Sequence, residues 1–165
     1  MTTVESIAEI VELLHREALC LDEQRWDDWL RLYTQDVEFW VPAWKSEHKT
    51  TEYPSREISL IYLTSRSRLE ERIQRIRSGR SAAALVLPRT AHTISNVLVG
   101  GNDDGPTVNC LCITHIYDPK RHKEFRTIAR HELRLVRVEA EWRICAKKVI
   151  VLNDNLPTKL EFYML

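Results

Sequence analysis

The chain has 165 residues, and 44% of them are hydrophobic. This length suits a single domain, residues 1–165, which can bury a core without disulfides or a structural metal. Its 24 basic and 24 acidic residues cancel, so no excess positive charge is available to neutralise phosphates, and we expect no nucleic-acid partner. We also expect no membrane association, because no apolar run reaches spanning length and the acidic N-terminal stretch does not resemble a secretory signal.

The first 33 residues carry two helical patterns. Apolar residues recur with i, i+3, i+4, i+7 spacing along residues 4–22, which predicts an amphipathic helix. A shorter helix is expected next, with one face formed by Trp26, Trp29, Leu30 and Tyr33. We expect Trp29 to be buried, because the apolar face of this helix has to cover the sheet that follows.

A third helix is predicted between Ser67, which could form a capping box with Glu70, and Gly79, which stands at the expected C′ position. Its polar face is rich in arginine. A solvated face is the favoured interpretation, and docking onto an acidic partner surface is the alternative. The arginines are Arg66, Arg68, Arg72, Arg75, Arg77 and Arg80.

Between these helices the pattern changes to that of a strand and a long loop. Val37, Phe39 and Val41 alternate with polar or aromatic neighbours, which predicts a strand over residues 36–42 that Pro42 ends. Residues 43–56 are polar and aperiodic, and a loop of this length in a compact domain usually has a binding role. A short strand is expected over residues 58–62.

Four further strands are predicted in the C-terminal half, over residues 90–100, 108–117, 125–138 and 142–152. In the third of these, apolar residues alternate with charged ones, so one face is expected in the core and the other in water. Helices followed by a long meander predict an α+β fold in which the N-terminal helices pack in a strongly curved, mostly antiparallel, cone-shaped sheet.

The cysteines and possible metal ligands give no metal site. Cys112 and His115 have the spacing of half a Rieske iron–sulfur site, but residues three apart in a strand point to opposite faces, and no matching C-x-H motif occurs upstream. We therefore expect no metal and no cofactor in this chain. All the cysteines fall in apolar patterns, which predicts free structural thiols and a cytoplasmic protein. They are Cys20, Cys110, Cys112 and Cys145.

Two histidines are candidates for acid–base chemistry. His92 shares a predicted strand face with Ile94, Asn96 and Leu98, and His131 lies on the inward face of its own strand, so both could project into the cone. With Asp36 or Tyr33 nearby, they could form the acid–base pair of a small dehydratase or isomerase. The favoured interpretation is that both histidines are hydrogen-bonded core residues, because nothing supplies a complete mechanism.

Several short motifs occur in one order along nearly the whole chain. They are Trp26-Asp27-Asp28-Trp29, Leu32-Tyr33, Asp36-Val37-Glu38-Phe39-Trp40, Pro42-Ala43-Trp44, Arg56-Glu57-Ile58-Ser59-Leu60-Ile61-Tyr62, Leu69-Glu70, Arg72-Ile73, Arg75-Ile76, His92, Ile94-Ser95-Asn96, Asn153-Asp154 and Pro157. In these motifs the chain resembles the small (β) subunit of aromatic-ring-hydroxylating dioxygenases, most closely the benzoate and anthranilate dioxygenase branch.

The resemblance implies a nuclear-transport-factor-2-like, or cystatin-like, cone and a non-catalytic structural role. It implies a partner α subunit that holds the Rieske [2Fe-2S] cluster and a mononuclear iron. Three α and three β subunits, with β–β contacts in a trimer, would form an NADH-dependent dioxygenase that cis-dihydroxylates an aromatic acid such as benzoate in aromatic catabolism.

Two other classes of protein remain open from the residues themselves. One is a stand-alone cone-fold dehydratase or isomerase that uses His92 or His131, and the other is a homo-oligomeric small-molecule-binding module. For subunit contacts we expect two segments, the loop 43–56 and the tail 160–165, because their aromatic residues belong to no amphipathic pattern. Folding back onto the monomer is the alternative for these aromatic residues, which are Trp44, Tyr53, Phe162 and Tyr163.

Overall fold

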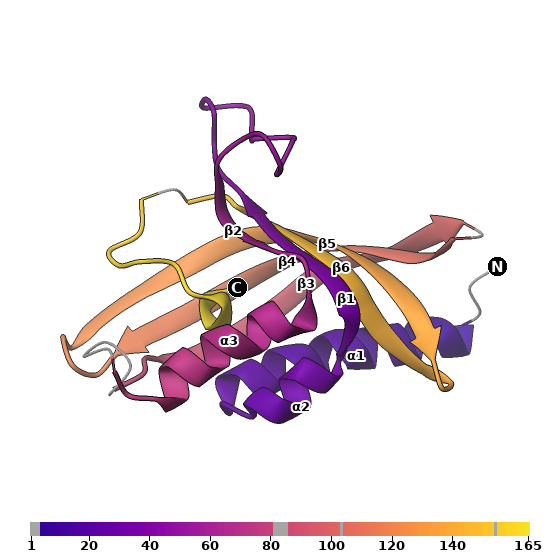
Figure 1. Cartoon of the computed structure of the whole chain (residues 1–165), viewed down its shortest axis with the longest axis horizontal. Coiled ribbons are helices and arrows are strands. Elements are labelled where there is room, and N and C mark those ends of the chain that lie inside the picture. Colours follow the sequence, from indigo (N-terminus) through magenta and orange to yellow (C-terminus); the bar gives the residue numbers. More distant parts are fainter. Residues whose placement is uncertain (1–3, 81–85, 103, 154) are drawn as a thin grey trace.

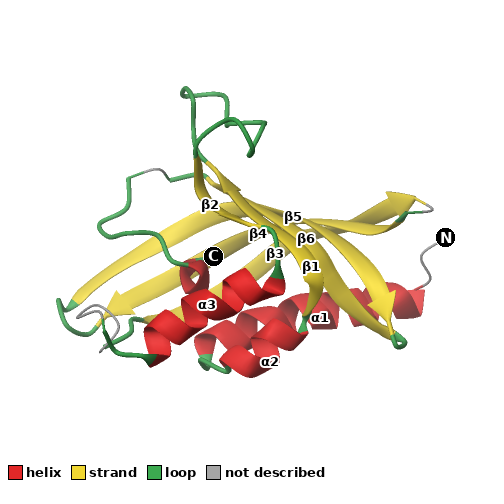
Figure 2. Cartoon of the chain, in the orientation of Figure 1, coloured by secondary structure: helices red, strands yellow, loops and turns green. Residues whose placement is uncertain are grey.

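The structure is a six-stranded sheet with its helices gathered on one face (Figures 1 and 2). It is a computed structural model and describes residues 4–80, 86–102, 104–153 and 155–165. The helices are α1 (Val4–Asp22), α2 (Trp26–Arg31) and α3 (Arg66–Arg77), with a short 3-10 helix η1 (Phe162–Met164) in the tail. The strands are β1 (Tyr33–Pro42), β2 (Ser59–Leu63), β3 (Arg89–Asn102), β4 (Gly105–Asp118), β5 (Lys123–Val138) and β6 (Glu141–Val151).

The strand order is β2-β1-β6-β5-β4-β3, and every neighbouring pair is antiparallel except β1 and β6, which run parallel. The predicted α+β fold with a curved, mostly antiparallel sheet is therefore confirmed. The long strands bend around the helices, so that one face of the sheet is concave and covered (Figure 1). The edges of the sheet are β2 and β3.

Helix α1 lies against the concave face with one side buried and the other in solvent, as its sequence period predicts. The buried side includes one charged residue, Glu17, among apolar ones. Among the described residues, no helix combines the length and apolar character needed to cross a membrane.

The prediction that Tyr33 lies on the second helix is wrong. Helix α2 ends at Arg31, and Tyr33 is the first residue of β1, in register with Ile144 of β6. The Ile144 amide donates to the Leu32 carbonyl at 2.8 Å. Pairing with β6 thus begins at Tyr33, close behind the end of the helix. As a result, β1 starts three residues before the predicted start at residue 36.

Helix α3 has the predicted end but not the predicted start. Gly79 follows the last turn with φ 60°, and its amide donates to the Ile76 carbonyl at 3.3 Å, as expected for a C′ glycine. The capping box is wrong. The helix begins at Arg66 with Ser65 as N-cap, and no side chain caps it, because the Ser65 and Ser67 hydroxyls are hydrogen-bonded to each other at 2.9 Å.

The predicted ends of β3, β4, β5 and β6 differ from the observed ends by a few residues. One predicted side-chain orientation in β3, that of Leu98, is wrong. His92 and Ile94 face the core, as expected. At Asn96 the backbone has φ 54°, and the register with β4 shifts between Ser95 and Leu98. This bulge reverses the alternation, so Leu98 is 71% exposed.

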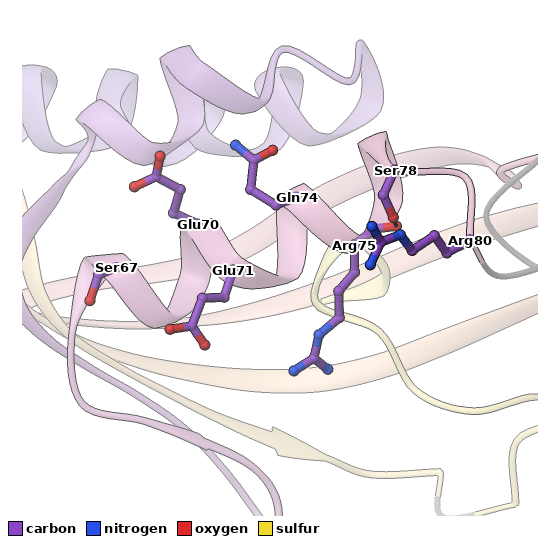
Figure 3. Close-up of a pocket in the computed structure, with 7 residues that line it drawn as sticks. All are labelled: Ser67, Glu70, Glu71, Gln74, Arg75, Ser78 and Arg80. Atoms are coloured by element: carbon purple, nitrogen blue, oxygen red, sulfur yellow. Dashed lines mark hydrogen bonds between the residues drawn. The ribbon is translucent and has the colours of Figure 1, made fainter.

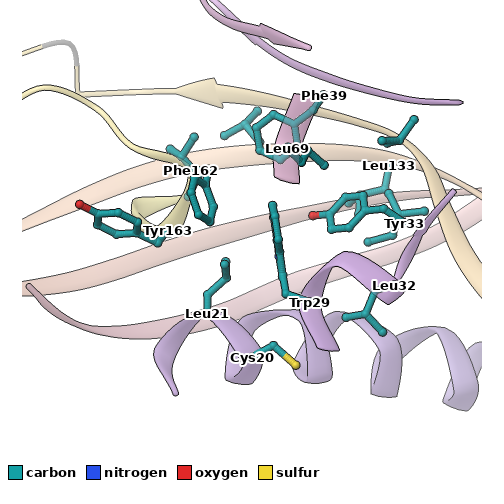
Figure 4. Close-up of a cluster of buried hydrophobic side chains, with 14 of the residues drawn as sticks. Cys20, Leu21, Trp29, Leu32, Tyr33, Phe39, Leu69, Leu133, Phe162 and Tyr163 are labelled. Atoms are coloured by element: carbon teal, nitrogen blue, oxygen red, sulfur yellow. The ribbon is translucent and has the colours of Figure 1, made fainter. Parts of the chain in front are cut away.

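The core fills the space between the helices and the concave face of the sheet (Figure 4). Trp29, predicted to be buried, is 0% exposed. Its ring lies 4.8 Å from that of Tyr33 and 5.0 Å from that of Phe162, measured between centroids. The tail therefore contributes to the core. Phe162 and Tyr163 are 1% and 8% exposed, so of the two interpretations given for these residues the structure favours folding back onto the monomer.

Candidate functional site

The polar centre of the molecule is an ion pair between Glu17 of α1 and Lys147 of β6. Lys147 Nζ lies 2.8 Å from Glu17 Oε1, and the two residues are 1% and 4% exposed. The same oxygen accepts hydrogen bonds from Trp29 Nε1 at 2.9 Å and from the Tyr33 hydroxyl at 2.6 Å. Residues from α1, α2, β1 and β6 thus meet at one carboxylate oxygen.

The electrostatics of this centre favour an ionised carboxylate. Burial raises the pKa of Glu17, but the charge of Lys147 and the hydrogen bonds from Lys147, Tyr33 and Trp29 outweigh burial and lower it from 4.5 to about 2. Burial and the Glu17 charge raise the pKa of Tyr33 well above its usual value. Because one oxygen of Glu17 already accepts from three donors, this carboxylate joins structural elements and is poorly placed to take a proton from a substrate.

His131, the first histidine candidate, lies on the inward face of β5 as predicted and is 4% exposed. Burial and the charge of Lys147 lower its pKa well below 6.5, so its imidazole is neutral. Its Nε2 atom has no hydrogen-bond partner among the described residues.

His92, the second candidate, pairs with a residue that the sequence did not indicate. Its Nδ1 atom lies 2.5 Å from Asp22 Oδ1, at the end of α1. The His92 amide and the Thr90 hydroxyl also donate to this carboxylate, at 3.0 and 2.8 Å. Burial raises the pKa of Asp22, but these bonds from His92 outweigh it, and the net shift is downward.

The alternative in which Asp36 or Tyr33 assists the histidines is not favoured by the structure. Asp36 is exposed, and the Tyr33 hydroxyl donates to Glu17. The His92 side chain is only 1% exposed, and its Nε2 also has no partner among the described residues. The structure thus places both histidines inside the molecule, where a substrate would have to displace packed side chains to reach them.

The cysteines are free, as predicted. Burial raises the pKa of Cys110 and of Cys112 to about 11, so neither is a reactive thiolate at neutral pH. Cys112 is buried and His115 is exposed on the opposite face of β4, so the two cannot share an iron. In the described ranges no group of three or more His, Cys, Asp or Glu residues could hold a metal.

The loop between β1 and β2 forms an arm that extends beyond the sheet, away from the helices (Figure 1). We call residues 43–58 the arm. Trp44 is half-buried at its base, where its indole N–H donates to the Val151 carbonyl at 2.7 Å. Tyr53 and Ile58 are 59% and 78% exposed. Glu57 accepts from the amides of Glu52 and Tyr53 at 2.6 and 2.8 Å, which gives the arm a defined shape.

Most arginines of α3 have partners within the chain. Arg68 pairs with Glu71, Arg72 with Glu161 and Arg77 with Asp27, and Arg66 donates to the Tyr33 carbonyl. The outer side of α3 borders a groove of about 910 Å³ (Figure 3). Its lining has both signs of charge, with Glu70 and Glu71 beside Arg75 and Arg80. Such a surface favours the solvated interpretation over a basic docking site.

Sequence reasoning missed the Glu17–Lys147 pair and Asp22. One signal was available: Glu17 lies one heptad after Ile10 on the apolar stripe of α1, and Lys147 occupies a core-facing position of β6, opposite Leu133. An acid and a base at two core-facing positions predict a buried ion pair, because neither is buried alone without a large cost.

The fold of this chain is shared with proteins of known structure. A protein from Nostoc punctiforme with a cystatin-like fold superimposes with a TM-score of 0.59, covering 94% of this chain and 96% of that chain at 14% identity. The β subunit of the benzoate 1,2-dioxygenase from Burkholderia mallei gives a TM-score of 0.78 at 30% identity, covering 100% of this chain and 99% of that chain. The cone of helices in a curved sheet is thus a known architecture.

Sequence comparison gives the family. Residues 16–158 match the family described as ring hydroxylating beta subunit. The toluate 1,2-dioxygenase subunit beta of Pseudomonas putida is 42% identical over 96% of this chain and 97% of its own length. The benzoate 1,2-dioxygenase subunit beta of Acinetobacter baylyi is 47% identical over 59% of this chain and 58% of that protein. The chain belongs to the ring-hydroxylating dioxygenase β-subunit family, and the predicted resemblance is confirmed.

Proposed function

We propose that this chain is the structural, non-catalytic β subunit of a Rieske non-haem iron dioxygenase that cis-dihydroxylates an aromatic acid such as benzoate. The observation that carries the proposal is the nearly full-length match to a toluate dioxygenase β subunit, at 42% identity over 96% of the chain. An oxygenase of this kind uses NADH-derived electrons to add both atoms of O2 to the ring, which opens the catabolism of the aromatic compound.

The iron centres, in this proposal, belong to an α subunit. The residues of this chain do not fit an iron–sulfur cluster: Cys112 and His115 point to opposite faces of β4, and Cys110 and Cys112 keep a raised pKa. We therefore assign no redox step to any residue of this chain. Its contribution is to support the assembly in which an α subunit works.

Assembly is expected to follow the ratio of three α and three β subunits, with β–β contacts in a trimer. We assign subunit contacts to the arm, because Tyr53 and Ile58 are exposed apolar side chains on a segment that its own hydrogen bonds hold in shape. Trp44 secures the base of the arm to β6. The free thiols suit a reducing compartment, and we place the assembly in the cytoplasm.

Reconstitution tests this function. The chain is purified alone and, separately, after co-expression with a Rieske-type α subunit, and cis-diol formation from benzoate is measured with reductase, NADH and O2. We expect turnover by the co-expressed complex and none by the isolated chain. Dehydratase or isomerase turnover by the isolated chain, lost in His92→Ala, would instead favour the stand-alone enzyme, for which the Asp22–His92 pair is the relevant observation.

A further inference from the structure

The tail fills the interior of the cone although it belongs to no strand of the sheet. In the segment Phe162–Leu165, every side chain is at most 8% exposed. Phe162 stacks on Trp29 at 5.0 Å with an interplanar angle of 27° (Figure 4). It also meets Trp26 edge-on at 5.6 Å. The phenyl ring of Phe162 is thus held between two tryptophans, as an aromatic ligand would be.

The tail also makes a polar contact with the sheet of the kind that a bound ligand makes. The Thr127 hydroxyl of β5 donates to the Met164 carbonyl. The backbone hydrogen bonds of the last residues run within the tail itself, from Met164 to Glu161 and from Leu165 to Phe162. The tail thus presents the Phe162 ring and the Met164 carbonyl oxygen to the interior, and Glu161 at its start pairs with Arg72 at 3.7 Å. It makes these contacts without the hydrogen-bond ladder that fixes a strand.

Further polar groups extend from Thr127 across the floor of the interior. Thr127 pairs with Thr114 of β4, and Thr114 pairs with His92 of β3, so the three residues form a row on the concave face. The His92 side chain is 1% exposed, and its Nε2 has no partner in the described part of the chain. A buried acceptor or donor without a partner is costly, and here it lies roughly 10 Å from Thr127, two strand spacings away.

We propose that the cone interior is a latent binding site for an aryl carbonyl compound, and that residues 161–165 occupy it as an internal ligand. The ring of the compound takes the place of Phe162 between Trp26 and Trp29, and its carbonyl oxygen accepts from Thr127 in place of Met164. A neutral compound tests the ring and carbonyl positions alone, because removing residues 161–165 also removes Glu161, which pairs with Arg72 at 3.7 Å, and a carboxylate would pair with that arginine instead.

Two variants and one pair of probes test the site. The first variant lacks residues 161–165, and the second is Phe162→Ala, which empties the ring position but keeps the Met164 carbonyl on Thr127. The probes are acetophenone and ethylbenzene, which have the same carbon skeleton and differ in the carbonyl oxygen. Binding is measured by calorimetry and by the shift in melting temperature, after circular dichroism has verified folding.

We expect the truncated chain to bind acetophenone with a dissociation constant on the order of 1 mM, within reach of a ligand of this size. Ethylbenzene should bind this variant at least about 10-fold more weakly. Phe162→Ala should bind both probes without preference, because Thr127 remains occupied. The unmodified chain should bind about 100-fold more weakly than the truncated chain, since the tail competes for the site.

The matched control is Thr127→Val in the truncated chain, an isosteric change that removes the hydroxyl. It should abolish the preference for acetophenone and leave the affinity for ethylbenzene unchanged. The proposal is wrong if neither folded variant binds a probe, or if Thr127→Val leaves the preference intact. Failure of both variants to fold would also contradict it, because a binding chamber has to persist without the segment that fills it.

Discussion

Lys147 of β6 lies 2.8 Å from Glu17 of α1, and the two residues, 130 positions apart in the sequence, are both buried. This pair attaches the first helix to the last strand and positions Trp29 and Tyr33 through the same oxygen. It is a structural centre, which agrees with the role of a supporting subunit.

Removing one member of this pair should be strongly destabilising. We expect Lys147→Met to lower the free energy of unfolding by about 3 to 5 kcal/mol, because it leaves the Glu17 carboxylate buried without its cation. Denaturant unfolding of the purified chain measures this change. The control is Lys148→Met, which breaks the more exposed Lys148–Glu132 pair at 3.6 Å and should cost less than about 1 kcal/mol. Equal effects of the two substitutions would contradict the assigned role of Lys147.

Acid should weaken the fold in two steps. The pKa of His131 is lowered by burial and by Lys147, so its contribution to stability is present above the unfolded pKa of about 6.5 and is lost as the pH falls below that value. The pKa of Glu17 is lowered from 4.5 to about 2. Its contribution, about 3 kcal/mol, is therefore lost between these two pH values.

Chemical unfolding between pH 7 and pH 2 checks both windows. Glu17→Gln should flatten the profile between pH 4.5 and about pH 2, and His131→Gln should flatten it as the pH falls below about 6.5. If Glu17→Gln has the same slope as the unmodified chain below pH 4.5, another carboxylate causes the acid unfolding.

Trp29 should be among the most costly core residues to truncate. It is 0% exposed, stacks on Phe162 and donates to Glu17. We expect Trp29→Ala to cost about 3 to 5 kcal/mol, the range for deleting a large buried aromatic side chain, as measured by denaturant unfolding. Trp29→Phe keeps most of the packing and should cost less. An unchanged melting temperature for Trp29→Ala would rule out the core role.

His92 should not be needed for the chemistry of the assembled oxygenase. We expect His92→Ala to keep the specific activity of the complex within a few-fold of normal once lost stability is allowed for, because its side chain is buried and pairs with Asp22. Steady-state turnover of complexes with verified subunit content measures this. A loss of several orders of magnitude with intact assembly would show that His92 has a catalytic role.

The arm should matter for assembly. We expect Tyr53→Ala to weaken subunit association by about 2 kcal/mol, roughly 30-fold, the effect of truncating an aromatic interface anchor. Leu98→Ala is the matched control, because Leu98 is also exposed but lies on the opposite edge strand of the sheet. Analytical ultracentrifugation over a concentration series gives both values. If the two variants dissociate alike, Tyr53 is not an anchor.

Local patterns were enough to predict the elements that bury a regular face. The alternation from Thr127 to Leu135 placed β5 correctly, and the aromatic spacing in α2 placed Trp29 in the core. The errors arose where distant residues decide the structure. The tail is short and has no period, so its burial depends on the space left between Trp26 and Trp29.

The candidate site was less predictable for the same reason. His92 and His131 could be placed on inward faces from strand period alone. The partner of His92 is Asp22, which lies 70 residues away at the end of α1. The bulge at Asn96 could not be predicted from the alternation of apolar and polar residues. Pairing across the cone depends on how the sheet curves, which a single element does not reveal.

Native mass spectrometry of the complex, with iron and sulfide analysis of each separated subunit, tests the proposed role most directly. The chain is co-expressed with a Rieske-type α subunit and purified by a tag on the β chain. We predict a complex of three α and three β subunits in which iron and acid-labile sulfide are recovered with α and the β chain is free of both. A β chain that remains without α, or that carries stoichiometric iron itself, would contradict the assignment as a structural subunit.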